Sequence, residues 1–107
     1  MNSPKVASTN RPSYTGSGIA LFSLGMVGAT PGALDLLDRT GTNAAIILAR
    51  HQRADFGSIG AEDVLANKYA IGNGGRILSA YLLGGESLWI VTEADRSSTT
   101  LLLPDEY

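Results

Sequence analysis

The residues best suited to chemistry lie in a charged turn between two apolar segments near the C-terminus. Glu93, Asp95 and Arg96 separate LWIV from TTLLL, in a chain of which only 17% is charged. If the last three apolar segments pair as consecutive antiparallel strands, Arg76 lies opposite Glu93, and Ser98 continues the polar row. A carboxylate held between two guanidinium groups could serve as a general base beside a phosphate whose charge the arginines stabilise.

Two interpretations of this polar row stand side by side. In the first, Glu93 is the base of a phosphodiester site, and Arg76 and Arg96 stabilise a pentavalent phosphate. Asp95 and Ser98 would then contribute to binding. In the second, which we prefer, Arg76 and Glu93 form a cross-strand ion pair, and Asp95 is a turn residue that bonds nearby backbone amides.

The single histidine, His51, belongs to a different part of the chain. It stands in the last turn of an expected helix, where a histidine usually interacts with the helix dipole or caps the last carbonyl groups. If that helix packs near the end of the sheet, His51 would join the polar row as a general acid. Asp55, four residues later, is a further binding candidate.

Neither a metal nor a cofactor is expected. A metal site at His51 and Asp55 would need a third ligand, and the chain contains no cysteine. The glycine-rich segments GSGIALFSLG and IGNGGR lack a Walker or Rossmann pattern and are typical of turns.

The sequence pattern around these candidate residues predicts an α+β fold. In this fold, N-terminal helices pack on a mainly antiparallel, three- or four-stranded C-terminal sheet. Thr30, Pro31 and Gly41 have the properties of the cap, first residue and end of a short helix of about two turns. Gly84-Gly85 predicts a two-residue hairpin turn. The other expected elements are a strand at 22–28, helices at about 43–52 (with Thr42 as its cap) and 61–71, and strands at 76–83, 87–93 and 98–103.

The expected register gives the sheet two largely apolar faces. One face carries Ile77, Tyr81, Leu83, Leu88, Ile90, Leu101 and Leu103. The other carries Arg76, Leu78, Ala80, Leu82, Trp89, Val91, Glu93, Ser98 and Leu102. Helices can cover one face, and the other needs the N-terminal strand, part of the helical layer or a second subunit. Because an exposed apolar face is unfavourable in a monomer, we expect a homo-oligomer formed through the other face.

The 107 residues predict one domain over residues 19–107, preceded by a disordered lead over residues 1–18 that is rich in Ser, Thr, Asn, Pro and Gly. Residues 19–29, IALFSLGMVGA, could form either the apolar core of an export signal or a strand. Gly25 and Gly28 interrupt this run and the basic residues stand far upstream, which favours the strand.

A cytoplasmic protein that does not enter a membrane is expected, because the apolar run is too short to span a bilayer. Nucleic acid remains an open partner, but the net charge of −2 does not favour it, since nucleic-acid binding usually needs a basic surface.

Three segments carry a resemblance to a known family: LGMVGATPGALDLL, HQRADFG, and GGRILSAYLL with LWIVTEADRSSTTLLLPDEY. Over about residues 21–107 the chain resembles small bacterial proteins of no established activity, carried on plasmids, integron cassettes and other mobile DNA. The family pattern H..GDWG matches His51, Asp55 and Gly57, whereas Ala54 replaces a glycine and Phe56 replaces a tryptophan. Some relatives are labelled as subunit M of type I restriction systems, but 107 residues hold neither a methyltransferase domain nor its cofactor motif.

The C-terminal layout is also similar to that of barnase-like ribonucleases. That resemblance implies a phosphate-binding role for Arg76, but it places Arg96 where the family has a catalytic histidine, and arginine cannot donate a proton at neutral pH. We therefore expect a non-enzymatic binding or accessory module of a mobile element. The alternative is a small ribonuclease that uses Glu93, Arg76, Arg96 and His51.

Overall fold

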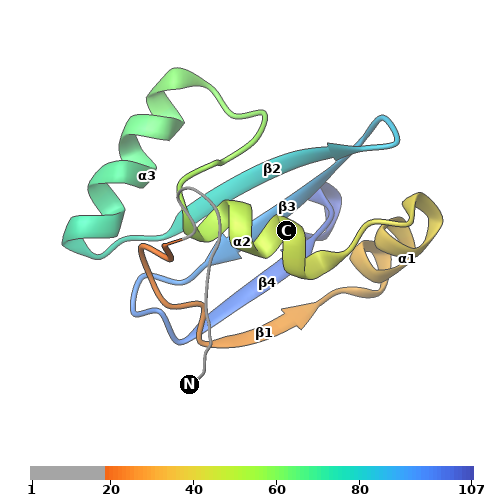
Figure 1. Cartoon of the computed structure of the whole chain (residues 1–107), viewed down its shortest axis with the longest axis horizontal. Coiled ribbons are helices and arrows are strands. Elements are labelled where there is room, and N and C mark those ends of the chain that lie inside the picture. Colours follow the sequence, from red (N-terminus) through yellow and green to blue (C-terminus); the bar gives the residue numbers. More distant parts are fainter. Residues whose placement is uncertain (1–18) are drawn as a thin grey trace, which may run out of the picture.

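The chain folds as an α+β domain, as the sequence predicts (Figure 1). The computed structural model describes residues 19–107, so the lead expected over residues 1–18 lies outside the described residues. The elements in chain order are β1 (Met26–Ala29), α1 (Pro31–Thr40), α2 (Ala44–Gln52), α3 (Ala61–Asn73), β2 (Ile77–Leu83), β3 (Glu86–Thr92), β4 (Ser98–Leu102) and the short 3-10 helix η1 (Pro104–Glu106).

The four strands form one sheet in the order β1-β4-β3-β2. The last three strands pair antiparallel in the order in which they are encoded, and β1 adds to β4 in parallel. The predicted register is confirmed, with Tyr81 opposite Leu88 and Trp89 opposite Leu102. Gly84 and Gly85 both have positive φ, at 58° and 85°, which the tight hairpin turn between β2 and β3 requires.

The first strand is shorter than expected, because it begins at Met26 instead of residue 22. Gly25, immediately before it, has a φ of 65°. A Cβ atom at this glycine would lie 2.4 Å from the carbonyl oxygen of Arg96. The chain therefore turns at Gly25, close against the β3–β4 connection, before it can extend as a strand.

The ends of α1 confirm the sequence prediction. The Thr30 side chain accepts a hydrogen bond from the amide of Ala33, Pro31 is the first helical residue, and Gly41 ends the helix with a φ of 64°. At ten residues α1 is somewhat longer than the two turns expected. The helix is thus defined by the residues that flank it, in agreement with the usual preferences at helix ends.

The second helix differs from its prediction in two ways. Its cap is Asn43, whose side chain accepts from the Ala45 amide, because the Thr42 hydroxyl instead bonds the hydroxyl of Thr40. The helix is also less buried than its apolar composition suggests, since the Ile46 side chain is 62% exposed. Only one side of α2 rests on the sheet.

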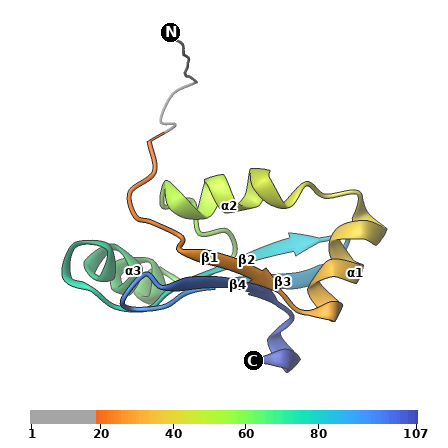
Figure 2. The ribbon, with the colours of Figure 1, turned by 90° about the horizontal axis from the view of Figure 1, so that it is seen from below.

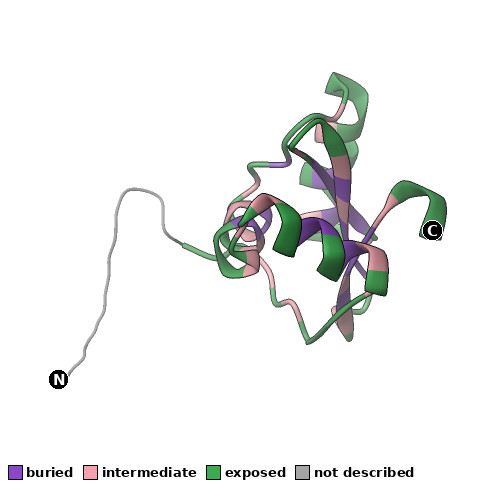
Figure 3. Ribbon diagram, turned by 90° about the vertical axis from the view of Figure 1, so that its right-hand side faces the viewer, coloured by how far each residue is buried: buried purple, intermediate pink, exposed green. Residues whose placement is uncertain are grey.

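The main core lies between the sheet and the layer formed by α1 and α2, which cover the same face of the sheet (Figure 2). The third helix, α3, lies beside β2, where a smaller cluster joins Phe56, Ala70 and Ile77. Figure 3 shows buried positions concentrated in the sheet and on the helix sides that face it. The main core consists of Ala33, Leu36, Leu37, Ile47, Tyr81, Leu88, Ile90 and Leu101.

The opposite face of the sheet is covered by no helix of the described chain except η1, which lies at the C-terminal end (Figure 2). We call it the open face. Its residues, which alternate with those of the core face, are Met26, Gly28, Leu78, Ala80, Leu82, Ser87, Trp89, Val91, Ser98, Thr100 and Leu102.

Candidate functional site

Arg76 and Glu93 form the predicted cross-strand ion pair at one end of the sheet. Nη2 of Arg76 lies 3.3 Å from Oε1 of Glu93, and the two side chains are 53% and 42% exposed. The carboxylate, followed by the nearby Tyr107, raises the pKa of Arg76. The pair is therefore open to solvent, where water screens the attraction between the two charges.

Tyr107 completes this group, although the sequence did not point to it. Its hydroxyl accepts a hydrogen bond from Nη1 of Arg76, and the guanidinium carbon lies 5.9 Å from the centre of its ring. The ring also meets that of Trp89 edge to face, with centroids 5.5 Å apart. Because Arg76, Trp89 and Glu93 share one face by strand alternation, an aromatic residue at the chain end can pack across all three.

Arg96 is directed to backbone oxygens. Nη1 donates to the carbonyl oxygens of Gly75 and Glu93 at 2.6 and 3.0 Å, and Nη2 donates to that of Ala70 at 2.7 Å. Its own backbone is left-handed, with a φ of 61°. The side chain thus connects the end of α3 to the β3–β4 turn, and these bonds occupy both terminal nitrogens.

His51 lies on α2, and its side chain is fully buried against the core face of the sheet. Nδ1 is 2.6 Å from the hydroxyl of Ser79 and Nε2 is 2.9 Å from that of Thr92, while Phe22 contacts the ring edge to face at 5.1 Å. Burial lowers the pKa of His51 to about 4, so the imidazole is neutral near pH 7.

The hydrogen-bond pattern around His51 assigns its protons. The Leu24 carbonyl can only accept, so the Thr99 hydroxyl donates to it at 2.8 Å. Thr99 then accepts from Thr92 at 2.7 Å, and Thr92 accepts from Nε2–H of His51. Ser79 donates to Nδ1. This chain of hydrogen bonds, which we call the hydroxyl relay, satisfies every polar group in it, as a buried network requires.

Ser79, Thr92 and Thr99 were missed by the sequence reasoning. Strand alternation places all of them on the core face, among positions otherwise filled by large apolar residues. Three hydroxyls on that face were the available signal of a buried polar partner from the helical layer.

The three other candidate residues have local roles. Asp55 accepts two hydrogen bonds from Arg50, at 2.7 and 3.1 Å, and this guanidinium lowers the pKa of Asp55. Asp95 accepts from the Ser97 amide at 3.0 Å within the turn, and its hydrogen bonds with Ser97 lower the pKa of Asp95. The Ser98 carbonyl accepts from the Glu93 amide, which continues the strand ladder.

The sequence-predicted residues are therefore only partly brought together. Arg76 and Glu93 meet on the open face, whereas His51 is buried on the core face and Arg96 bonds to backbone carbonyls. The proposed general acid and the proposed base are separated by the sheet itself.

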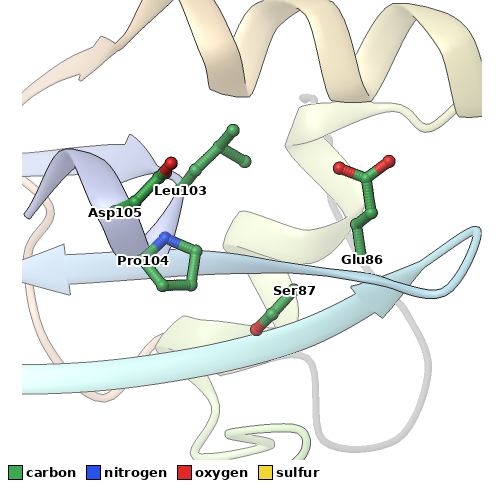
Figure 4. Close-up of a pocket in the computed structure, with 5 residues that line it drawn as sticks. All are labelled: Glu86, Ser87, Leu103, Pro104 and Asp105. Atoms are coloured by element: carbon green, nitrogen blue, oxygen red, sulfur yellow. The ribbon is translucent and has the colours of Figure 1, made fainter.

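A shallow depression lies elsewhere, between the start of β3 and the C-terminal turn (Figure 4). It has a volume of about 340 Å³, and two of its five lining residues are acidic. One of these, Glu86, accepts a hydrogen bond from Arg39 at 3.1 Å. Its lining residues are Glu86, Ser87, Leu103, Pro104 and Asp105.

Comparison with known proteins gives no relative. No protein-family model, no curated protein and no solved structure matches this chain. The function is therefore argued from the geometry of the chain.

The described part of the chain offers neither a metal site nor a membrane-spanning helix. Residues 19–107 contain no group of three or more His, Cys, Asp or Glu side chains arranged to hold a metal ion. Within the same range, no helix is both long and apolar enough to cross a membrane.

Proposed function

We propose that the protein is a non-enzymatic binding or accessory module that self-associates, and that the open face of its sheet is the contact surface. The observation that carries this proposal is the unequal cover of the sheet. Both α1 and α2 lie on the core face, while the open face has only the short C-terminal turn (Figure 2).

Large apolar side chains on the open face support this assignment. Leu82 is 64% exposed and Met26 is 79% exposed, and Trp89 is half-buried beside Tyr107, which is itself 64% exposed. Exposed apolar side chains also lie on the helices, such as Ile46 on α2, and Ala80, Val91 and Leu102 of the open face are buried within the single chain. The exposed residues around them leave apolar area at the rim of this face, and such area commonly marks a surface that binds another protein.

The arrangement of the charged residues supports a non-enzymatic role over RNA cleavage. A ribonuclease would need the base Glu93 and a general acid on opposite sides of one phosphate. The imidazole of His51 lies on the other side of the sheet, and Arg96 bonds to backbone carbonyls. The net charge of −2 adds no attraction for a polyanion.

The resemblance of residues 21–107 to proteins carried on mobile DNA supports the setting that we propose, an accessory protein of a mobile element. Within residues 19–107 the candidate reactive groups are not brought together, and this arrangement agrees with a binding role.

Light scattering of the full chain tests the contact surface. We expect a mass above the 11.2 kDa of one chain, and we expect Leu82→Glu to reduce it, because a carboxylate cannot be buried unpaired in an apolar contact. Leu34→Glu is the matched control, since Leu34 is a similarly exposed leucine, at 57%, on α1. An unchanged mass for Leu82→Glu would contradict the assignment of the open face.

A further inference from the structure

The two outer edges of the sheet differ in how far their backbone groups are hydrogen-bonded. The edge of β2 is occupied by the chain itself: the Ala80 amide donates to the Phe56 carbonyl at 3.0 Å, and the Ala80 carbonyl accepts from the Ser58 amide at 2.6 Å. The Asn67 side chain bonds both the carbonyl and the amide of Leu78, at 2.7 and 3.1 Å. This edge therefore has no free backbone groups at these two residues.

The edge of β1 is open. Its pairing with β4 uses alternate residues, since the Met26 amide donates to the Ser97 carbonyl and the Thr30 amide donates to the Leu101 carbonyl, both at 3.0 Å. Strand alternation directs the amide and carbonyl groups of Val27 and Ala29 away from β4. We find no partner for them within residues 19–107.

The sequence of β1 contains no charged residue, proline or bulge, so its short length of four residues is the only protection of this edge strand. Natural proteins normally guard an exposed edge with a charged residue, a proline or a bulge, because unpaired strands recruit other chains. The strand reads MVGA, all four residues are exposed, and Val27 is 45% exposed. An edge of this composition is suited to pairing with another strand.

We propose that β1 pairs antiparallel with β1 of a second copy, about a two-fold axis at Gly28. In this register Val27 of each copy lies opposite Ala29 of the other and exchanges both hydrogen bonds with it. Every outward backbone group of β1 then has a partner, so the edge is complementary to itself.

Gly28 provides a second reason for this register. A glycine inside a strand weakens it, and here no non-neighbouring atom of residues 19–107 lies within 4 Å of where its Cβ would stand. The fold of a single copy therefore does not require glycine at this position. At the two-fold axis the two Gly28 residues form a non-hydrogen-bonded pair, in which Cα atoms approach to about 4.5 Å.

The two-fold axis of an antiparallel pair runs perpendicular to the sheet, so both open faces lie on the same side of a continuous sheet. This inference rests on the proposed self-association and adds a second contact to it, because β1 joins two copies edge to edge. The joined open faces then form the contact with a second such pair.

Ala29→Pro tests the pairing with little effect on the single copy. Proline removes the amide that points outward, while the amides of Met26 and Thr30, which bind β4, remain. Ala29→Ser is the matched control, because it keeps the amide. We expect light scattering to give the same mass for the wild type and Ala29→Ser, and a smaller mass for a folded Ala29→Pro, which keeps only the open-face contact.

Amide hydrogen exchange gives a second measurement, which does not depend on any variant. We expect the exchange of Val27 and Ala29 to slow as the wild-type concentration is raised, with little change at Met26. A wild type that stays monomeric at micromolar concentration would overturn the pairing. A mass that is unchanged by Ala29→Pro but reduced by Leu82→Glu would also overturn it, and would leave the proposed open-face contact standing.

Discussion

His51 shows how a single side chain can be assigned by its surroundings. The sequence predicts that it interacts with the dipole in the last turn of a helix. In the fold it is fully buried, and the hydroxyl relay fixes it as the neutral tautomer protonated at Nε2. Protonation at Nδ1 would take away the acceptor for Ser79 and place a charge in the core, so acid should destabilise the fold.

The pH dependence of stability follows from the direction of this shift. The pKa of His51 falls from 6.5 to about 4 in the folded chain, so between these values the unfolded chain binds the additional proton. The neutral His51 therefore contributes fully to the free energy of unfolding above pH 6.5. As the pH falls towards 4, the free energy of unfolding decreases by about 3 kcal/mol. Urea unfolding at several pH values, with an NMR titration of His51, measures both quantities.

Three carboxyl groups with lowered pKa values also affect stability, but at a lower pH than His51. The pKa values of Asp55, Asp95 and Glu106 are all lowered in the fold, so their contributions are lost mainly below their ordinary values. A stability that stayed constant between pH 6.5 and 5 would contradict the buried, neutral assignment of His51.

Ala54 offers a second prediction at the residue scale. Its φ of 69° is unfavourable for any residue with a Cβ, and it stands where the resembled pattern has glycine. We expect Ala54→Gly to raise the free energy of unfolding by about 1 kcal/mol, by relieving this strain. Denaturant unfolding measures the change, and Ala54→Val, which is β-branched, should lower the stability instead.

At the scale of elements, Arg96 is important as a connection between α3 and the sheet. Its hydrogen bonds reach the Gly75 carbonyl and the Ala70 carbonyl, which also accepts from the Gly74 amide at the end of α3. We expect Arg96→Ala to lower the free energy of unfolding by about 1–3 kcal/mol. Arg96→Lys should restore only part of it, because an ammonium group cannot reach several carbonyls in a planar array.

Glu93→Ala is the comparison for this measurement. It removes the solvent-exposed ion pair with Arg76 and should have a smaller effect than the loss of Arg96. If Glu93→Ala were the more destabilising change, the structural role assigned to Arg96 would be wrong.

At the scale of the whole molecule, the sequence predicted the antiparallel strands β2, β3 and β4 best. The Gly84-Gly85 turn fixes which residues of β2 and β3 face each other, so alternation then assigns the faces. The ion pair of Arg76 and Glu93 followed from the same register. Local turn chemistry was sufficient for these predictions.

The features that the sequence did not predict depend on contacts between segments that are distant in the sequence. The parallel pairing of β1 with β4 is decided by where α1 and α2 can pack, and four residues carry too little pattern to predict it. For the same reason the burial of His51 could not be predicted, since it requires α2 to lie across Ser79 and Thr92. The C-terminal contacts of Tyr107 likewise join parts that share no local signal.

The position of β1 has a consequence for synthesis on the ribosome. Within residues 19–107 its one neighbour in the sheet is β4, which is translated after every other strand described, and Glu106 accepts hydrogen bonds from Thr30 and Gly32 at the start of α1. At about 5–20 residues per second, β1 waits several seconds before β4 emerges. During that interval α1 and α2 have only part of the sheet to pack against, so β1 cannot become native until β4 has been made.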